Sequence, residues 1–115
     1  MISTKELKLV ADQDIPWTAL GGGMRRKIMS YNENIMLTKI DFEKGAIGAL
    51  HSHPHVQISF ITAGGKFKVT VGTETKLLKD GDVYFVPANE KHGVVCVKEG
   101  QLIDVFTPMR EDFLN

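Results

Sequence analysis

Short apolar segments recur along the chain and are separated by turns rich in glycine and charged residues. The alternation of apolar and polar positions is clearest where Phe67, Val69 and Val71 share one face of a segment. Apolar runs of this length and composition predict β-strands at residues 25–30, 35–42, 56–62, 66–71, 75–78, 83–86, 93–97 and 102–106. Helical periodicity is weak, and we expect only one short helical turn, within residues 109–115.

The number and spacing of these strands predict the fold class. About ten short strands in a small chain are typical of an all-β antiparallel jelly-roll barrel, either closed or two-sheeted. The 115 residues are predicted to form a single domain, residues 1–115, with a loop-rich N-terminal segment at about residues 1–30.

Composition and charge exclude several classes of protein. Lys and Arg total 14, as do Asp and Glu, so the chain lacks the basic surplus that nucleic-acid binding requires. The single cysteine, Cys96, excludes an intrachain disulfide framework. No apolar run is long enough for a transmembrane helix, and the N-terminal residues lack a signal-peptide pattern. We therefore expect a cytoplasmic protein with no nucleic-acid or membrane partner.

The histidines carry the strongest chemical signal. Three of the four, His51, His53 and His55, lie within five residues, and His92 comes much later. Side chains two residues apart on a strand point to the same face, so His51 and His53 are expected to converge, followed by Gln57. Because imidazole is the commonest ligand of divalent transition metals, this cluster predicts a metal site that His92 joins. The alternative is a group of exposed loop histidines.

His55 is the ambiguous member of the cluster. Its parity places it inward with His51 and His53, but Pro54 lacks an amide proton and can mark a bulge that turns the next residue outward. We expect His55 at the rim of the site, with direct ligation of the metal as the alternative.

Two stretches resemble the two sequence motifs of the cupin family. Residues 45–64 follow the pattern G(X)5HXH(X)3Q(X)6G, and residues 81–92 follow G(X)5PXN(X)2H. The resemblance implies a small antiparallel jelly-roll barrel that binds one divalent metal ion. By that resemblance the ligands are His51, His53, Gln57 and His92. Sites of this kind accept nickel, zinc, manganese, iron or cobalt.

Within the cupins, two further stretches resemble the pectin-degradation group, the KdgF type. They are HSHPHVQIS at residues 51–59 and DVFTPMREDFL at residues 104–114. The resemblance implies a metal-dependent enzyme that opens and ketonises 4,5-unsaturated monouronates from pectin or alginate. It also implies a homodimer and a small anionic sugar as substrate. Asp104, Phe106 and Arg110 match the positions that the group uses around its substrate.

Three positions depart from the patterns of these relatives. Val56 stands where the pectin-degradation group commonly has glutamate, and Met109 stands where a second proline is common. Asn89 replaces the usual glycine of the second cupin motif, although asparagine also tolerates the left-handed conformation.

The residue types suit this chemistry on their own terms. Asp104 and Phe106 have the same parity on one predicted strand, so both can face the barrel interior, and Asp104 is a candidate general acid or base. Arg110 offers a planar fork for a carboxylate. Because Gln57 and three imidazoles are all neutral, a bound divalent ion would keep its full charge and attract an anionic substrate.

Two other functions compete with this interpretation. The first is another metal cupin enzyme, such as an iron dioxygenase, which would consume oxygen. The second is a non-catalytic cupin that binds a sugar or other ligand around a structural metal, and it would bind without conversion.

Overall fold

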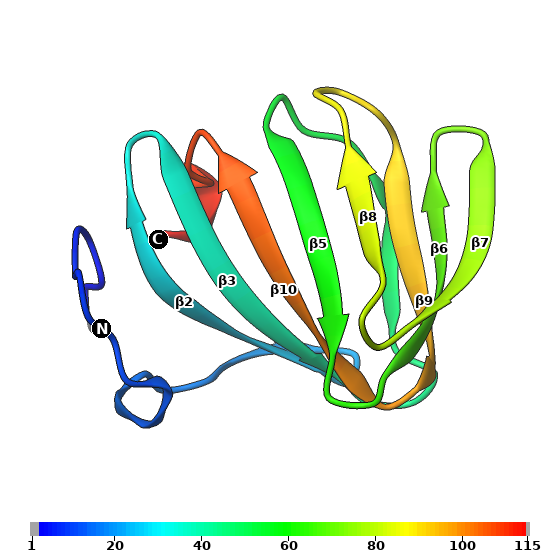
Figure 1. The fold of residues 1–115 in the computed structure, drawn as a ribbon, viewed down its shortest axis with the longest axis horizontal. Coiled ribbons are helices and arrows are strands. Elements are labelled where there is room, and N and C mark those ends of the chain that lie inside the picture. Colours follow the sequence, from blue (N-terminus) through cyan, green and yellow to red (C-terminus); the bar gives the residue numbers. More distant parts are fainter. Residues whose placement is uncertain (1–2, 115) are drawn as a thin grey trace.

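The protein is built almost entirely of strands. The structure, a computed structural model, describes residues 3–114. Its strands are β1 (Thr18–Gly21), β2 (Met24–Asn32), β3 (Ile35–Phe42), β4 (Ile47–His51), β5 (Val56–Thr62), β6 (Lys66–Val71), β7 (Glu74–Lys79), β8 (Val83–Val86), β9 (His92–Lys98) and β10 (Gly100–Thr107) (Figure 1). Two short 3-10 turns, η1 (Asp12–Asp14) and η2 (Glu111–Phe113), complete the chain.

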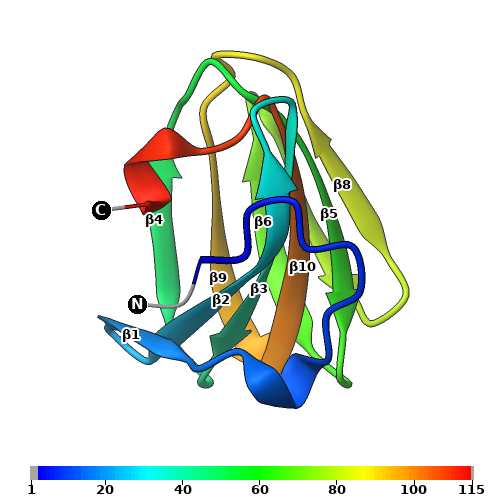
Figure 2. The same ribbon diagram turned by 90° about the vertical axis from the view of Figure 1, so that its left-hand side faces the viewer.

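The strands form two antiparallel sheets that face each other (Figures 1 and 2). The larger sheet has the order β1-β2-β3-β10-β5-β8, and the smaller has the order β4-β9-β6-β7. This arrangement confirms the two-sheeted form of the predicted antiparallel jelly roll, because the strands do not close into one continuous barrel.

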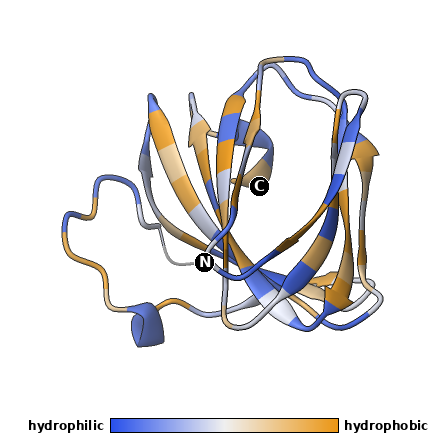
Figure 3. Ribbon diagram, turned by 45° about the vertical axis from the view of Figure 1, so that its right-hand side comes forward, coloured by the Kyte–Doolittle hydropathy of each residue, from blue (hydrophilic) through white to orange (hydrophobic). Residues whose placement is uncertain are grey.

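Hydrophobic side chains from both sheets meet between them. In β10, every second residue from Gly100 to Phe106 is buried, which is the period of a strand with one face on the core. Figure 3 shows hydrophobic residues along the strands and hydrophilic ones in η1. The rings of Phe42 and Phe67 lie edge to face with centroids 5.1 Å apart. The core cluster consists of Phe42, Ala46, Ile61, Phe67, Val69, Tyr84, Val86, Val94, Cys96 and Leu102.

Each strand that apolar patterning predicts is present, and two further strands are not predicted by it. All residues of β1 are exposed. In β4 one residue is half-buried and the other four are exposed. Because neither strand has a buried residue, neither carries the alternation of buried and exposed positions by which a strand is predicted. The segment expected to be loop-rich, residues 1–30, contains η1, β1 and most of β2. The turn expected near the C-terminus is η2, and residues 1, 2 and 115 lie outside the described part.

Turn conformations agree with the residues that form them. Gly64, in the hairpin between β5 and β6, has a φ of 73°. Asn89, which replaces the glycine of the second cupin motif, has a φ of 67° and so adopts the left-handed conformation expected of it. Within residues 3–114, no helix has the length and apolar character needed to cross a membrane.

Candidate metal centre

His51 and His92 face each other across two paired strands. His51 ends β4, His92 begins β9, and the two are direct partners in the antiparallel ladder. Their ring centroids are 4.3 Å apart. The two backbones approach closely because Gly93 has no side chain: a Cβ there would lie 2.8 Å from the carbonyl oxygen of Gly48. The expectation that the fold brings His92 beside the first motif is confirmed.

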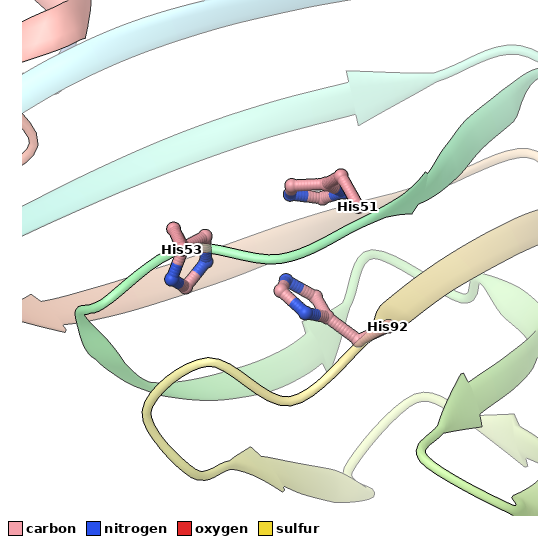
Figure 4. A group of neighbouring side chains, drawn as sticks. All are labelled: His51, His53 and His92. Atoms are coloured by element: carbon pink, nitrogen blue, oxygen red, sulfur yellow. The ribbon is translucent and has the colours of Figure 1, made fainter.

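His53 joins the cluster from a loop. The expectation that His51 and His53 lie on one strand is wrong, because β4 ends at His51 and β5 begins only at Val56. A residue before proline stays extended, and the carbonyl of His53 accepts a hydrogen bond from the amide of Asn89 at 2.7 Å. The centroid of the His53 ring lies 4.7 Å from that of the His92 ring and 5.6 Å from that of the His51 ring. Figure 4 shows the three side chains together.

The three imidazoles present a compatible set of ligand atoms. One ring nitrogen from each of His51, His53 and His92 lies within 4.8 Å of the others. Each Nδ1 lies at hydrogen-bond distance from a backbone carbonyl oxygen: 2.8 Å for His51 to Ala49, 3.0 Å for His53 to His55, and 2.9 Å for His92 to Glu90. Because a carbonyl only accepts, Nδ1 carries the proton and Nε2 keeps the lone pair that a metal needs.

The electrostatics keep two of these imidazoles neutral. Burial lowers the pKa of His92 to about 4, and burial also lowers the pKa of His53. The Nε2 atom of His92 is buried and has no hydrogen-bond partner among residues 3–114. A buried acceptor without a partner is costly, and a bound cation would satisfy it. The residues present therefore fit a divalent transition metal.

Gln57 lies beside the histidines with its amide oxygen toward them. Its Nε2 donates a hydrogen bond to Oγ of Ser59 at 2.8 Å, and that hydroxyl donates to Oδ1 of Asp104 at 2.6 Å. A serine hydroxyl has one proton, so Ser59 must accept from the amide nitrogen of Gln57. Oε1 of Gln57 is therefore the atom 3.0 Å from Nε2 of His53. Two acceptors at this distance suit a shared cation.

Asp104 is a buried carboxyl group with a perturbed proton affinity. It is only 4% exposed. Burial raises its pKa to about 6, against the hydrogen bond from Ser59 and the charges of Arg110 and Arg26, which act to lower it. A carboxyl group with this pKa can take up and release a proton near neutral pH.

Phe106 and Arg110 complete the wall next to the histidines. The Phe106 ring is buried, with its centroid 5.8 Å from that of His53. The guanidinium carbon of Arg110 lies 5.1 Å from the Phe106 ring centroid. Nε and Nη2 of Arg110 donate to the two carboxylate oxygens of Asp112 at 3.0 and 2.7 Å. Two of the guanidinium nitrogens of Arg110 are thus already used in hydrogen bonds within the protein.

The predicted site residues meet at one cavity between the sheets. This cavity has a volume of about 220 Å³. Six of the residues that sequence analysis singles out line it, namely His51, Gln57, His92, Asp104, Phe106 and Arg110. His53 reaches the same place through its ring contacts. His55 is not one of the converging histidines, but its carbonyl holds the His53 ring.

A larger cavity, of about 680 Å³, lies beside the hairpin between β1 and β2. Its polar lining includes Arg25, Asp41 and Gln101, which are hydrogen-bonded to one another through both carboxylate oxygens of Asp41. None of the histidines lines it. We place the chemistry at the smaller cavity, because His92 lines it and Nε2 of His92 is a buried ligand atom without a hydrogen-bond partner among residues 3–114.

Sequence analysis missed several groups at the small cavity. Ser59 has the same parity as Gln57 on β5, so alternation could have indicated it. Arg26 and Phe113 also line the cavity, from β2 and η2. The fold brings Arg26 and Phe113 together from opposite ends of the chain, and no local sequence pattern predicts such a contact.

Comparisons with known proteins agree with this geometry. The family model described as Cupin domain matches residues 38–106. The chain is 46% identical over 105 residues to a pectin degradation protein KdgF of Dickeya dadantii, covering 90% of this chain and 94% of that protein. An RmlC-like cupin from Shewanella frigidimarina superimposes with a TM-score of 0.89 at 40% identity, covering 92% of this chain and 95% of the other.

The structure of KdgF from a Halomonas species has a TM-score of 0.88 at 30% identity and covers 92% of this chain and 99% of that one. These likenesses extend over both sheets and both motifs. The chain therefore belongs to the cupin family and, within it, to the KdgF-type pectin-degradation group.

Proposed function

We propose that this protein converts 4,5-unsaturated monouronates, derived from pectin or alginate, into linear keto forms by ring opening and ketonisation. The observation that carries the proposal is a buried carboxyl group, Asp104, in a small cavity lined by His51 and His92, which converge with His53 into a set of ligand atoms that could hold a metal ion. The 46% identity to a pectin degradation protein supports the choice of sugar.

The metal would be held by Nε2 of His51, His53 and His92 and by Oε1 of Gln57. When bound, a divalent ion polarises a hydroxyl or carbonyl oxygen and stabilises negative charge that develops on it. All four ligands are neutral, so they leave the positive charge of the site uncompensated. Ser59 fixes the orientation of the Gln57 amide. Because the Ser59 hydroxyl donates its proton to Asp104, it can only accept a hydrogen bond from the amide nitrogen of Gln57.

Asp104 is the proposed proton carrier. Ring opening breaks the bond between C1 and the ring oxygen while the C1 hydroxyl loses its proton, and it yields an aldehyde and an enol at C5. Ketonisation then moves the enol proton to C4, so that the product is an isomer of the substrate and no oxidant is needed. The pKa of Asp104, raised to about 6, lets one group both accept and return a proton.

Arg110 and Phe106 would shape the substrate end of the cavity. The charge of Arg110 faces a cavity that a uronate carboxylate could enter, and the buried Phe106 ring forms an apolar wall. At about 220 Å³ the cavity is smaller than the roughly 300–1,000 Å³ that encloses drug-sized ligands, which favours a single monosaccharide.

The outer face of the larger sheet supports the proposal of a homodimer. On β5 and β8 it carries four apolar side chains that are each 42–55% exposed, Ile58, Phe60, Val83 and Phe85. They are cross-strand neighbours, because Ile58 pairs with Phe85 and Phe60 pairs with Val83. A contiguous apolar patch of this kind is characteristic of a protein interface.

Product analysis tests the reaction class. We expect nuclear magnetic resonance to show a linear keto product and mass spectrometry to give it the mass of the substrate, with no oxygen consumed. Stoichiometric oxygen uptake would identify a dioxygenase instead. Tight binding of the unsaturated uronate without any product would identify a non-catalytic binding protein.

A further inference from the structure

Arg26 places a second guanidinium group at the substrate cavity. On β2 the alternation of side chains buries Lys27 and Met29 on one face, and Lys27 bonds there to the carbonyl oxygen of Asp12 in the N-terminal segment. Arg26 lies on the opposite face, beside its ladder partner Ile40 on β3, and lines the cavity. The same cavity is lined by His51, His92 and Asp104.

The C-terminal turn η2 brings the two arginines to one aromatic ring. The guanidinium carbon of Arg26 lies 3.8 Å from the centroid of Phe113, and that of Arg110 lies 4.3 Å from the same centroid. Stacking on a ring leaves the N–H groups at the edge of the guanidinium plane free to donate hydrogen bonds. The cavity thus has two stacked cations beside its carboxyl group, Asp104.

The two guanidinium groups differ in their partners. Arg110 donates through Nε and Nη2 to both carboxylate oxygens of Asp112. Arg26 forms no ion pair or hydrogen bond through its guanidinium with any of residues 3–114. Burial, followed by the charge of Arg110, lowers the pKa of Arg26. A partly desolvated cation without a partner is unfavourable, and an anionic ligand would relieve that cost.

We propose that Arg26 binds the carboxylate of the substrate and sets the specificity for uronates over neutral sugars. The inference rests on the proposed function and deepens it, because it names a residue of that site whose guanidinium group is free to bind the substrate carboxylate. Two parallel hydrogen bonds from one guanidinium match a carboxylate in both charge and geometry. Arg110, held by Asp112, then acts beside it mainly through its charge.

A purely structural role for Arg26 makes a different prediction. Arg26 could serve only to hold Phe113 and η2 against the sheet. In that case its loss would weaken every ligand of the cavity by a similar factor. A carboxylate contact instead weakens only ligands that carry the negative charge, so a charged and a neutral version of one sugar separate the two roles.

The experiment measures binding of D-galacturonate and of its neutral methyl ester by calorimetry, with protein carrying the metal with which it purifies. We expect Arg26→Gln to weaken galacturonate binding by about 10- to 100-fold and ester binding by less than about threefold. Arg26→Lys, which keeps the charge but not the fork, should fall between wild type and Arg26→Gln. Should Arg26→Gln fail to fold, this variant carries the test.

Arg25→Gln is the matched control, because Arg25 is exposed, pairs with Asp41 and is not part of the proposed machinery. It should leave both affinities unchanged. An equal loss of affinity for acid and ester in Arg26→Gln, or no loss for either, would overturn the inference. Turnover of the unsaturated uronate is measured in parallel, with the effect of Arg26→Gln expected in KM more than in kcat.

The two proposals fail separately. If wild-type protein does not convert the unsaturated uronate but loses its preference for acid over ester in Arg26→Gln, the proposed function is wrong and Arg26 still binds carboxylates. If wild-type protein converts the uronate and Arg26→Gln keeps the preference, the function stands and the role of Arg26 is wrong.

Discussion

At the scale of single residues, the direction of two hydrogen bonds explains the choice of glutamine at position 57. Asp104 receives the only proton of the Ser59 hydroxyl, so Ser59 can only accept from position 57. A glutamate at position 57 would place a second carboxylate beside the Ser59 oxygen, and no proton would be available for a hydrogen bond between them. The amide instead gives Ser59 a donor and turns its own oxygen toward His53.

The Asp104→Asn variant should lose turnover and keep its metal. Loss of a general acid or base costs about 10²- to 10⁴-fold in rate. We expect kcat to fall by about 100-fold or more. Metal analysis should show the same metal content per chain as in wild type. Retained turnover would contradict the proposed role of Asp104.

The same variant should be more stable than wild type at pH 7.5. Because the pKa of Asp104 is raised to about 6 on folding, the folded protein binds the proton more tightly, and stability falls as pH rises from about 4 to 6. Asn removes this penalty, which is on the order of 3 kcal/mol for a shift of about two pKa units. Urea denaturation of metal-free protein should show a gain at pH 7.5 that shrinks toward pH 4. An equal difference at both pH values would contradict the raised pKa.

Ser59→Ala should move the acidic limb of the pH–rate profile to higher pH. The hydrogen bond from Ser59 lowers the pKa of Asp104, so its removal raises that pKa further. If turnover needs ionised Asp104, the apparent pKa in kcat/KM rises. Ser52→Ala, in the exposed segment before His53, is the control. An unshifted limb in Ser59→Ala would show that Asp104 does not set it.

At the scale of elements, three strand ends and one loop supply the proposed metal ligands: the end of β4, the starts of β5 and β9, and the loop that carries His53. Patterning predicts β5, β6 and β10 because one face of each is buried and the other is not. It misses β1 and β4, which are exposed edge strands with no such contrast. Sequence predicts that His51 and His53 converge, but for the wrong reason, because the contact between His53 and Asn89 is tertiary.

Gly93→Ala should disturb both stability and metal binding, because Gly93 sets the spacing of β4 and β9. The added Cβ would lie 2.8 Å from the carbonyl oxygen of Gly48 and 3.1 Å from the amide nitrogen of Leu50, so β4 must move and carry His51 with it. Overpacking of this kind costs about 1–3 kcal/mol. Denaturation and competition with a chelator measure the two effects.

Gly45→Ala separates the steric effect from backbone strain. Gly45 has a φ of 87°, but a Cβ there meets nothing within 4 Å. We expect some loss of stability and unchanged metal affinity. Unchanged metal affinity in Gly93→Ala as well would contradict the role assigned to the spacing of β4 and β9.

At the scale of the whole molecule, the net charge of zero means that attraction for an anionic substrate must be local. It would come from the metal together with Arg26 and Arg110, all at one cavity. Sequence alone indicates Arg110 and the metal ligands through spacing and resemblance. It cannot indicate Arg26, because the contact of Arg26 with Phe113 joins β2 to η2 and exists only in the folded chain.

Phe85→Glu should abolish the proposed homodimer. Phe85 is 55% exposed on the apolar face of β5 and β8, and a charge there would be buried without a partner in the dimer. Light scattering should give twice the 12.8 kDa chain mass for wild type and a single chain mass for the variant. Leu77→Glu on β7, at the same exposure in the other sheet, should stay dimeric. A monomeric wild type would contradict the proposal.

The most direct test of the central claim follows the ultraviolet absorbance of the double bond in 4,5-unsaturated galacturonate. Metal-loaded protein should accelerate loss of this signal well beyond the spontaneous rate, while chelator-treated protein and Asp104→Asn should not. Loss of the signal at the spontaneous rate with metal-loaded wild-type protein, for this sugar and its mannuronate counterpart alike, would contradict the account.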